Sequence, residues 1–342
     1  MSNKNNLLYN IVEELVGAGM AEEEAIAYQR SIFESLSIPN NDAFIDRNVY
    51  YQDSVNKATE EISFLKREEY VNRVFEGDCL DVMRKLPDQS IDMVLCDLPY
   101  GTTQNKWDSI IPLDKLWEEY SRIVKDNGAI VLTSHSVFTA ILINSNPGLY
   151  RYKWIWVKSK ATNFLNAKKQ PLRKHEDVCV FYKKQPIYNP QMINGLPYDK
   201  GVRKNQLSGS YGDFHPVHVQ SDGMRNPTDV VYFKTAESEG VVVHPTQKPV
   251  ELGRYFVRTY TNAGDVVLDN TAGSGSFVVA ALLEGRNFVA IEKNKDVALF
   301  KNKKVDYIEI IKKRLRKAWS VLDQQTRAQI YNFNIIKEFI KE

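Results

Sequence analysis

Cysteine is scarce in this sequence, with three residues among 342, and Cys79, Cys96 and Cys179 lack the CxxC spacing of a metal or redox motif. We therefore expect neither a disulfide framework nor a zinc site, and no bound metal. A run of about 18 apolar residues, long enough to span a bilayer, is also missing. The first residues lack the basic and apolar regions of a signal peptide. These absences predict a protein of the reducing cytoplasm that makes no membrane contact.

Net charge is small as well, formally +2, but it is unevenly distributed. Residues 1–70 hold 6 Lys and Arg against 13 Asp and Glu, a local charge of −7. Residues 151–204 hold 13 against 3, a local +10, and residues 301–317 hold 8 against 2, a local +6. Concentrated positive charge is one way to bind a polyanion, and a solvated surface is the alternative interpretation.

From about Arg73 onward, short apolar runs alternate with amphipathic stretches, which predicts an α/β fold. The expected strands are 91–96, 129–133, 153–157, 177–182, 265–268 and 287–291. The expected helices between them include 80–86, 113–124 and 251–260. The predicted architecture is a doubly wound, mostly parallel sheet.

Two segments differ from this alternation of strands and helices. In residues 1–70, apolar residues recur at helical spacing. Residues 184–240 are rich in Asn, Gly, Pro and Tyr and have little periodicity, which is typical of loops. The chain is therefore expected to divide into an acidic helical extension, a first α/β part, a loop-rich insert, a second α/β part and a basic helical tail, at residues 1–70, 71–183, 184–240, 241–300 and 301–342.

The first chemical motif, Asp97-Leu98-Pro99-Tyr100, directly follows an apolar strand. A carboxylate at the carboxyl end of a strand lies where open α/β sheets bind their ligands. The proline fixes φ and offers only a carbonyl acceptor, and the tyrosine supplies a stacking face. Acceptors beside a flat ring suit a planar group that carries an NH2, such as a nucleobase amine. An ordinary loop turn is the alternative for these residues taken alone.

A second motif is the glycine-rich loop DNTAGSGS at 269–276, which follows a strand and opens a helix at about Phe277. Small residues let the backbone approach a ligand, and a helix N-terminus favours an anion. No Gly-Lys-[Ser/Thr] follows, and Phe277 and Val278 replace the third glycine of a dinucleotide fingerprint. Glu292 lies 19 residues beyond Gly273, close to the spacing at which an acidic residue binds ribose hydroxyls. The loop predicts a nucleoside-bearing cofactor, with a tight turn that binds no ligand as the alternative.

Two further motifs are less specific. His244-Pro245-Thr246-Gln247-Lys248-Pro249 precedes an expected helix and is typical of a helix start. Gly77-Asp78 precedes another helix, where the aspartate can serve simply as an N-cap acceptor.

Together, and in this order, the four motifs resemble those of the amino-directed DNA methyltransferases that use S-adenosylmethionine (AdoMet). The sequence reads GDCLDVMRKLPDQSIDMVLCDLPYG, then a basic middle, then HPTQKPVEL, DVVLDNTAGSGSF and FVAIEKN. A catalytic motif that precedes the cofactor motif is the arrangement of the β class of that family. The resemblance covers about residues 73–300 and implies a Rossmann-like methyltransferase fold with permuted motif order, in which the insert is the target-recognition region.

The resemblance also implies roles for individual residues. Asp97 and the Leu98 carbonyl would accept hydrogen bonds from the target amine, with Pro99 shaping the turn and Tyr100 stacking on the extruded base. AdoMet would be bound by residues at its adenine, ribose, amino-acid and methionine sides, namely Asp78, Glu292, Thr246, Lys248, Asp269, Ala272, Gly273 and Gly275. Leu98 replaces the commonest second residue, proline, but keeps the carbonyl. Asn270 and Thr271 stand where Pro and Phe are commoner.

The implied reaction is methyl transfer to the exocyclic N6 of an adenine flipped out of double-stranded DNA, with N4 of cytosine as the alternative. Asp at position 97 favours adenine, because N4-cytosine relatives often carry Ser there. No cysteine nucleophile is needed, and Cys96 is expected to be a buried strand residue. Phosphate contacts are expected from the basic middle, through Lys158, Lys160, Lys168, Lys169, Arg173 and Lys174. Base-edge contacts with the DNA are expected from the insert, where residues of suitable type are Arg203, Lys204, Gln206, Gln220, Arg225 and Asn226.

Two other classes of protein compete with this interpretation. An NAD-dependent oxidoreductase would account for the glycine loop and Glu292 but not for Asp97-Leu98-Pro99-Tyr100 or the basic middle. A non-catalytic DNA-binding module is the other, and the intact Asp97, Tyr100, Gly273 and Glu292 argue against it. A homodimer, a cognate restriction endonuclease and the recognition sequence stay open.

Overall fold

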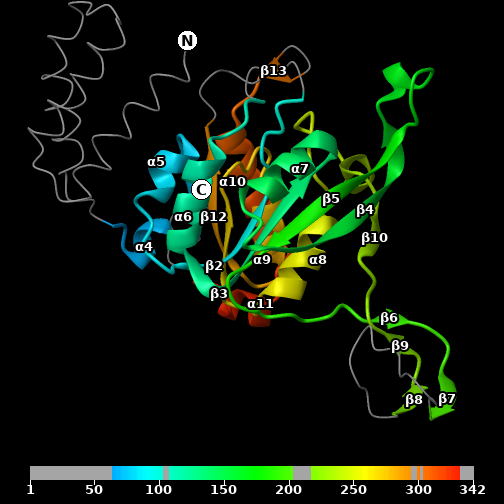
Figure 1. The fold of residues 1–342 in the computed structure, drawn as a ribbon. Helices are drawn as coiled ribbons and strands as arrows, with labels where there is room; N and C mark the ends of the chain where they lie inside the picture. Colours follow the sequence, from blue (N-terminus) through cyan, green and yellow to red (C-terminus); the bar gives the residue numbers. More distant parts are fainter. Residues whose placement is uncertain (1–63, 103–107, 203–216, 294–298, 301–302, 332–342) are drawn as a thin grey trace, which may run out of the picture. The chain divides into compact units, whose positions relative to one another are not determined.

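The computed structural model describes residues 64–102, 108–202, 217–293, 299–300 and 303–331. Their centre is an eight-stranded sheet with the order β1-β12-β11-β2-β3-β5-β4-β10 (Figure 1). The strands, in chain order, are β1 (Arg73–Glu76), β2 (Ile91–Cys96), β3 (Val124–Ser134), β4 (Tyr150–Thr162), β5 (Arg173–Phe181), β10 (Val230–Phe233), β11 (Val266–Asp269) and β12 (Asn287–Glu292). All neighbours pair in parallel except that β5 runs antiparallel to both β3 and β4. The predicted doubly wound, mostly parallel sheet is confirmed.

Helices cover both faces of the sheet. Side chains of β2 alternate between two cores, with Met93 and Leu95 in one and Val94 and Cys96 in the other. The first core is completed by α8 (Val250–Tyr260), α9 (Ser276–Leu283) and α10 (Tyr307–Ser320). The second is completed by α5 (Cys79–Met83), α6 (Leu113–Ile123) and α7 (Ser136–Ser145). Because β2 is buried on both faces, it has an almost continuous apolar sequence without polar alternation.

Smaller elements lie outside this framework. They are α4 (Arg67–Tyr70), the 3₁₀ turns η2 (Phe164–Asn166) and η3 (Ala236–Glu239), α11 (Gln324–Ala328), and three strand pairs, β6 (Ile193–Asn194) with β9 (Met224–Arg225), β7 (Tyr198–Val202) with β8 (His218–Ser221), and β13 (Leu299–Phe300) with β14 (Lys303–Lys304). The expected insert thus holds short antiparallel pairs, and its last strand, β10, joins the edge of the main sheet beside β4. In the basic tail, Ile311 and Leu315 of α10 are fully buried in the first core.

The expected elements match the structure with a few shifts in their ends. The helix expected at 80–86 is the shorter α5, and the strand expected at 153–157 is the long β4. The helices expected at the start of the chain lie outside the described residues, apart from α4. None of the helices in the described ranges combines the length and apolar character needed to cross a membrane.

The topology gathers loops that are distant in the sequence at one edge of the sheet. The parallel strands β2, β3, β11 and β12 all end at this edge. Because β5 is antiparallel, its beginning lies there too, with Asp177 paired to Ser134 at the end of β3. The strand before the catalytic motif, β2, is a direct neighbour of the strand before the glycine loop, β11. The two motifs, although distant in the sequence, therefore meet at this edge of the sheet.

Candidate active site

Asp97 is the first residue after β2 and lies at this carboxyl edge. Its Oδ1 accepts hydrogen bonds from the Tyr100 hydroxyl at 2.7 Å and from Thr133 Oγ1 on β3. Its Oδ2 lies 2.6 Å from the Nζ of Lys248, in the loop before α8. The carboxylate is thus held from three elements, and its side chain is still 21% exposed.

Asp97 begins a row of four groups whose charges alternate, which we call the charge row: Asp97, Lys248, Glu176 and Lys158. Lys248 Nζ lies 3.5 Å from Glu176 Oε2, and Glu176 Oε1 lies 3.0 Å from Lys158 Nζ. Lys158 is on β4 and Glu176 on β5. Burial disfavours both charged forms, but the carboxylates outweigh it and raise the pKa of Lys248, while the two lysines lower the pKa of Glu176. Each buried charge in the row is therefore compensated.

Two of these residues are not placed as expected. Lys158, expected to contact a DNA phosphate, is 3% exposed and paired with Glu176, so its ammonium group is not on the surface. That expectation is corrected, because a buried ammonium is retained by its carboxylate partner. Lys248, expected at the amino-acid end of the cofactor, contacts the Asp97 carboxylate in this structure. Glu176 belongs to no motif, and its one signal in the sequence is that it is one of three carboxylates in the basic segment 151–204.

Tyr100, expected to stack on a base, is partly buried, and its ring contacts three other side chains. Its ring is stacked on Phe138 of α7 with centroids 5.0 Å apart and meets the edge of His135 at 4.9 Å. Lys248 Nζ lies 5.5 Å from the ring centroid. Burial and the Asp97 carboxylate raise the pKa of Tyr100 well above its usual value, so the hydroxyl acts as a donor to Asp97. Burial and nearby Arg173 lower the pKa of His135.

The glycine loop is joined directly to the turn that begins at Asp97. The Thr271 hydroxyl donates to the backbone carbonyl of Asp97 at 2.9 Å and lies 2.9 Å from the Cys96 sulfur. Gly273 and Gly275 have φ of +53° and +77°, a left-handed conformation that strains other residues. The Gly273 amide donates to Glu292 Oε2 at 2.7 Å. These contacts fix the loop between the ends of β2 and β12.

Asp269, the last residue of β11, is 2% exposed. Burial and the neighbouring Asp97 and Glu292 carboxylates raise its pKa to about 8. The amide of Thr271 donates to its Oδ1 at 3.3 Å. A cationic group bound next to this carboxylate would stabilise its ionised form.

The remaining predicted cofactor residues are placed less uniformly. Asp78 caps α5 by accepting from the Leu80 amide at 3.0 Å, and its other oxygen lies 3.5 Å from Lys293. Ala272 is buried in the first core. Thr246 is exposed and bonded to His244 Nδ1, and burial lowers the pKa of His244 to about 4, which keeps that ring neutral.

Arg314 is a supporting residue that none of the motifs contains. Its guanidinium, on α10, donates to the Ser274 carbonyl at 2.6 Å and to the hydroxyls of Ser274 and Ser276 at 3.0 and 3.2 Å. Burial lowers its pKa. The tail therefore braces the glycine loop, although its sequence reads simply as a basic amphipathic helix.

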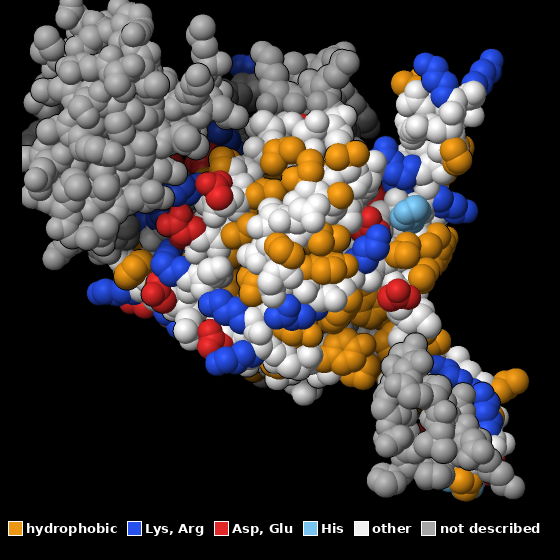
Figure 2. Space-filling model, viewed as in Figure 1, with side chains coloured by type: hydrophobic (Ala, Val, Ile, Leu, Met, Phe, Trp, Pro, Cys, Tyr) orange, Lys and Arg blue, Asp and Glu red, His pale blue; other side chains and the backbone are white. Residues whose placement is uncertain are grey.

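The predicted DNA-contacting residues fall into three groups. Lys160, Lys168, Lys169 and Lys174 are exposed along or near the end of the β4–β5 hairpin, where Figure 2 shows basic and hydrophobic side chains together at the upper right. Arg173 is half-buried and bonded to His135, and Lys158 is buried in the charge row. Arg203, Lys204 and Gln206 lie outside the described residues.

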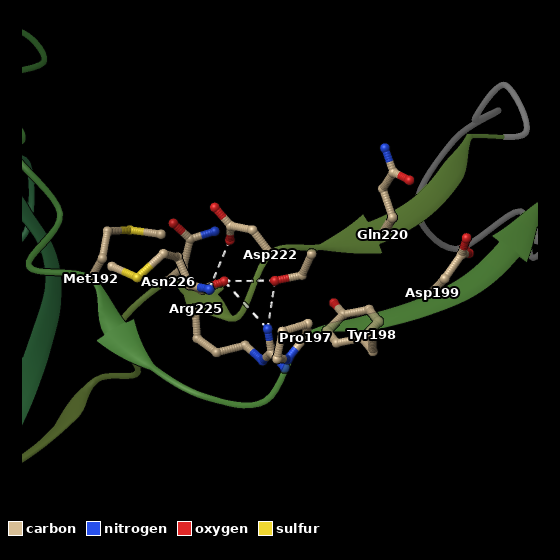
Figure 3. Close-up of a pocket in the computed structure, with 10 residues that line it drawn as sticks. Met192, Pro197, Tyr198, Asp199, Gln220, Asp222, Arg225 and Asn226 are labelled. Carbon is tan, nitrogen blue, oxygen red and sulfur yellow. Dashed lines mark hydrogen bonds between the residues drawn. The ribbon is translucent and has the colours of Figure 1, made fainter.

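An open cavity of about 1050 Å³ lies in the insert, remote from Asp97 in the sequence and on different strands. Figure 3 shows Arg225, Asn226 and Gln220 around it, together with Tyr198 and Met192. Arg225 lies 4.4 Å from the centroid of the Tyr198 ring and donates to Ser221 Oγ at 2.6 Å and to the Leu196 carbonyl. Its guanidinium thus holds the insert together, whereas Gln220 and Asn226 line the open side.

Fold and site together define an enzyme of the doubly wound α/β class with its chemistry at the carboxyl edge of the sheet. The family model described as DNA methylase (N6_N4_Mtase) matches residues 91–303, more than half of the chain. The chain belongs to this family, the amino-directed DNA methyltransferases, and the resemblance read from the four motifs is confirmed.

The chain has low sequence identity to individual relatives. The chain is 25% identical over 256 residues to the type II methyltransferase M.BglII of Bacillus subtilis, covering 67% of each protein. It is 25% identical over 251 residues to the DNA adenine methyltransferase YhdJ of Escherichia coli (strain K12), covering 65% of this chain and 79% of that protein. The solved PvuII DNA methyltransferase (cytosine-N4-specific) shares the fold, with a TM-score of 0.50 and 14% identity, covering 76% of this chain and 91% of that one.

Proposed function

We propose that this chain transfers the methyl group of AdoMet to the exocyclic N6 of an adenine flipped out of duplex DNA. The observation that carries the proposal is the hydrogen bond from the Thr271 hydroxyl to the Asp97 carbonyl, 2.9 Å long. It ties the loop that would hold the cofactor to the turn that would hold the target amine. Methyl transfer depends mainly on aligning these two reactants, and a rigid junction supplies that alignment.

The residues of the glycine loop fit a cofactor with a nucleoside and a cationic amino-acid end. Asp269 is a buried carboxyl group, and a bound positive charge would stabilise its ionised form. Glu292, at the end of β12, and Asp78, at the start of α5, would hold the nucleoside. Left-handed φ at Gly273 and Gly275 explains why the loop has no side chains at these two positions. When bound there, AdoMet supplies a methyl group already activated by its sulfonium.

Asp97 and the Leu98 carbonyl would bind the two N–H groups of the target amine. The lone pair of that nitrogen is delocalised into the base, so the amine is a poor nucleophile. Hydrogen bonds to two acceptors favour a more tetrahedral nitrogen and stabilise its developing positive charge. This role needs an oxygen of Asp97 that faces the amine.

In the structure Lys248 Nζ contacts Oδ2 of Asp97, so a movement of the ammonium would open this oxygen to the base amine. Glu176 Oε2 is 3.5 Å from Lys248 Nζ and makes no hydrogen bond within the described part of the chain. A short shift of Lys248 toward this oxygen would free Asp97 while the buried ammonium stays paired. The same shift would take the ammonium away from the Tyr100 ring. Glu176 would thus be a positioning residue that acts through Lys248.

Adenine is favoured over cytosine by the aspartate at position 97 and by the likeness to an enzyme named as an adenine methyltransferase. The cytosine amine offers the same N–H groups, which makes N4-cytosine the second candidate. The test is to express the protein in cells, digest their DNA to nucleosides and identify the modified base. We expect N6-methyladenine with the natural sequence and unmodified DNA with Asp97→Ala. N4-methylcytosine would refute the choice of base, and unmodified DNA in both strains would favour a non-catalytic DNA-binding module.

A further inference from the structure

The end of the β4–β5 hairpin exposes large apolar side chains. We call residues 163–172, between the two strands, the hairpin tip. Phe164 and Leu165 are 74% and 85% exposed, and Leu172 is 46% exposed. Adjacent exposed apolar residues of this size mark an interaction site more often than a bare surface.

The hairpin tip is an ordered turn that holds these side chains outward. Asn163 has a left-handed φ of 70°, and its Oδ1 accepts from Asn166 Nδ2 at 2.7 Å. The amide of Ala167 donates to the Phe164 carbonyl at 3.1 Å, which closes a 3₁₀ turn at η2. The backbone of the turn is thus satisfied internally while the phenyl and isobutyl groups remain in solvent.

Positive charge surrounds the apolar pair. Residues 159–175 contain no Asp or Glu and five basic residues, Lys160, Lys168, Lys169, Arg173 and Lys174. Two such tips would repel each other, so a symmetric contact between the tips of two copies is disfavoured. A polyanion with an apolar interior that can be opened between stacked rings matches both features.

The hairpin also connects the tip to the charge row. Lys158 and Thr162 lie on the same strand, four residues apart, which corresponds to about 13 Å of extended chain. On the other strand, β5, Arg173 and Glu176 are three residues apart. Whatever the tip contacts is therefore held close to the side chains that surround Asp97.

We propose that the hairpin tip is a wedge, and that Phe164 and Leu165 enter the base stack of duplex DNA beside the target and help to extrude it. This inference rests on the proposed function. Inserted apolar side chains unstack a base step, which lowers the cost of moving one base out of the helix. The surrounding lysines would contact the phosphates on either side of the opened step.

The test compares two duplexes that contain the methylated site, which is first located by sequencing modified bases in DNA from expressing cells. In one duplex the target base is paired, and in the other it faces an abasic position, so that little energy is needed to extrude it. The wedge variant is Phe164→Ser with Leu165→Ser. Val321→Ser, at a residue that is 69% exposed and distant in the sequence, is the matched control.

We expect the wedge variant to methylate the paired duplex about tenfold or more slowly than the natural protein and to regain most of the rate on the abasic duplex. The control should match the natural protein on both. Equal rates on the paired duplex, or a defect that the abasic position does not rescue, would overturn the wedge. A natural protein that is dimeric in sedimentation, and a wedge variant that is monomeric, would instead make the tip a contact between copies. If the natural protein methylates no DNA, the proposed function fails and not the wedge alone.

Discussion

Lysines occur both within a strand and at the tip of the β4–β5 hairpin, but their surroundings differ completely. On β4, four residues before the strand ends, Lys158 is buried, shares Glu176 with Lys248, and lies in a row that ends at Asp97. At the tip, Lys168 and Lys169 are exposed in a segment without any carboxylate. In the sequence both belong to one basic stretch of local charge +10.

The difference shows that burial decides what a charge does. A buried ammonium group has lost its hydration and must keep a carboxylate partner, so this part of β4 is structurally constrained. An exposed lysine contributes little to stability but remains available to neutralise a phosphate. We call Lys158 and the rest of the charge row the buried end of this comparison, and the hairpin tip its exposed end. The same hairpin can therefore order the Asp97 carboxylate through the buried end and bind substrate through the exposed end. Each prediction below changes one of the two and leaves the other intact.

The largest effect is expected from Asp97→Asn, at the buried end. The amide keeps the shape of the side chain but presents an NH2 group to the target amine and loses the charge that stabilises the transition state. We expect labelled methyl transfer to fall about 10³-fold while AdoMet binding is retained. Asp114→Asn, at an exposed residue in the first turn of α6, is the control and should have full activity. Near-normal turnover by Asp97→Asn would refute the catalytic role of Asp97.

Glu176→Gln tests the charge row itself. It leaves Asp97 as the one carboxylate in the row for the two buried lysines. The free energy of unfolding should therefore fall by about 3 kcal/mol in urea denaturation. Adding Lys158→Met should recover part of the loss, because it removes the ammonium group that has lost its carboxylate partner. The matched control is Glu118→Gln, whose pair with Lys115 has both side chains more than half exposed, and which should change stability by less than about 0.5 kcal/mol. Equal effects of the two substitutions would show that the row is not structurally important.

The central strands and the loops that follow them could be predicted from the sequence. Apolar runs predicted the strands at the centre of the sheet, because β2 and β11 are buried on both faces and contain almost no polar residues. The positions of the Asp97 turn and of the glycine loop could be predicted because each follows directly on such a strand. Their meeting at one edge followed from parallel strands, and the Thr271–Asp97 hydrogen bond is its outcome.

The charge row could not be predicted from the sequence, because it depends on ion pairs between segments that are distant in the chain. Glu176 reaches the site only because β5 runs antiparallel to its neighbours, and local sequence does not specify strand direction. Lys158 has the residue type of a phosphate contact, and only its burial shows otherwise. Arg314 braces the glycine loop from α10, which packs on α9 across the first core. In each case the deciding quantity is burial against a segment far away in the chain.

A smaller effect on AdoMet affinity is expected when pH changes the protonation of Asp269, which is buried at the end of β11 beside the Asp97 turn. Burial and nearby carboxylates raise its pKa to about 8, so the unliganded site is largely protonated at neutral pH. A cationic ligand group prefers the ionised form, and AdoMet affinity should therefore rise by up to about tenfold per pH unit between pH 6 and 8 and level off above. Stability of the unliganded protein should change in the opposite sense and decrease with pH over the same range, because the folded state binds the proton more tightly than the unfolded state. Calorimetric titration with AdoMet should show the first trend weakened in Asp269→Asn, and urea denaturation should show the second weakened. An unchanged pH dependence in that variant would assign the titration to another group.

The smallest effect is expected at the exposed end, from Lys168→Gln combined with Lys169→Gln. If both lysines contact phosphates, the slope of log affinity for duplex DNA against log salt should become shallower by about 1.8, which corresponds to roughly a tenfold change between 50 and 200 mM salt. Stability should stay close to that of the natural protein, since both side chains are exposed. Lys158→Gln is the matched control from the same basic stretch, and it should lower stability without changing the salt slope, because its ammonium is paired with Glu176. A salt slope altered by Lys158→Gln but not by the tip variant would reverse the comparison, and would mean that the charge row opens toward DNA while the hairpin tip stays in solvent.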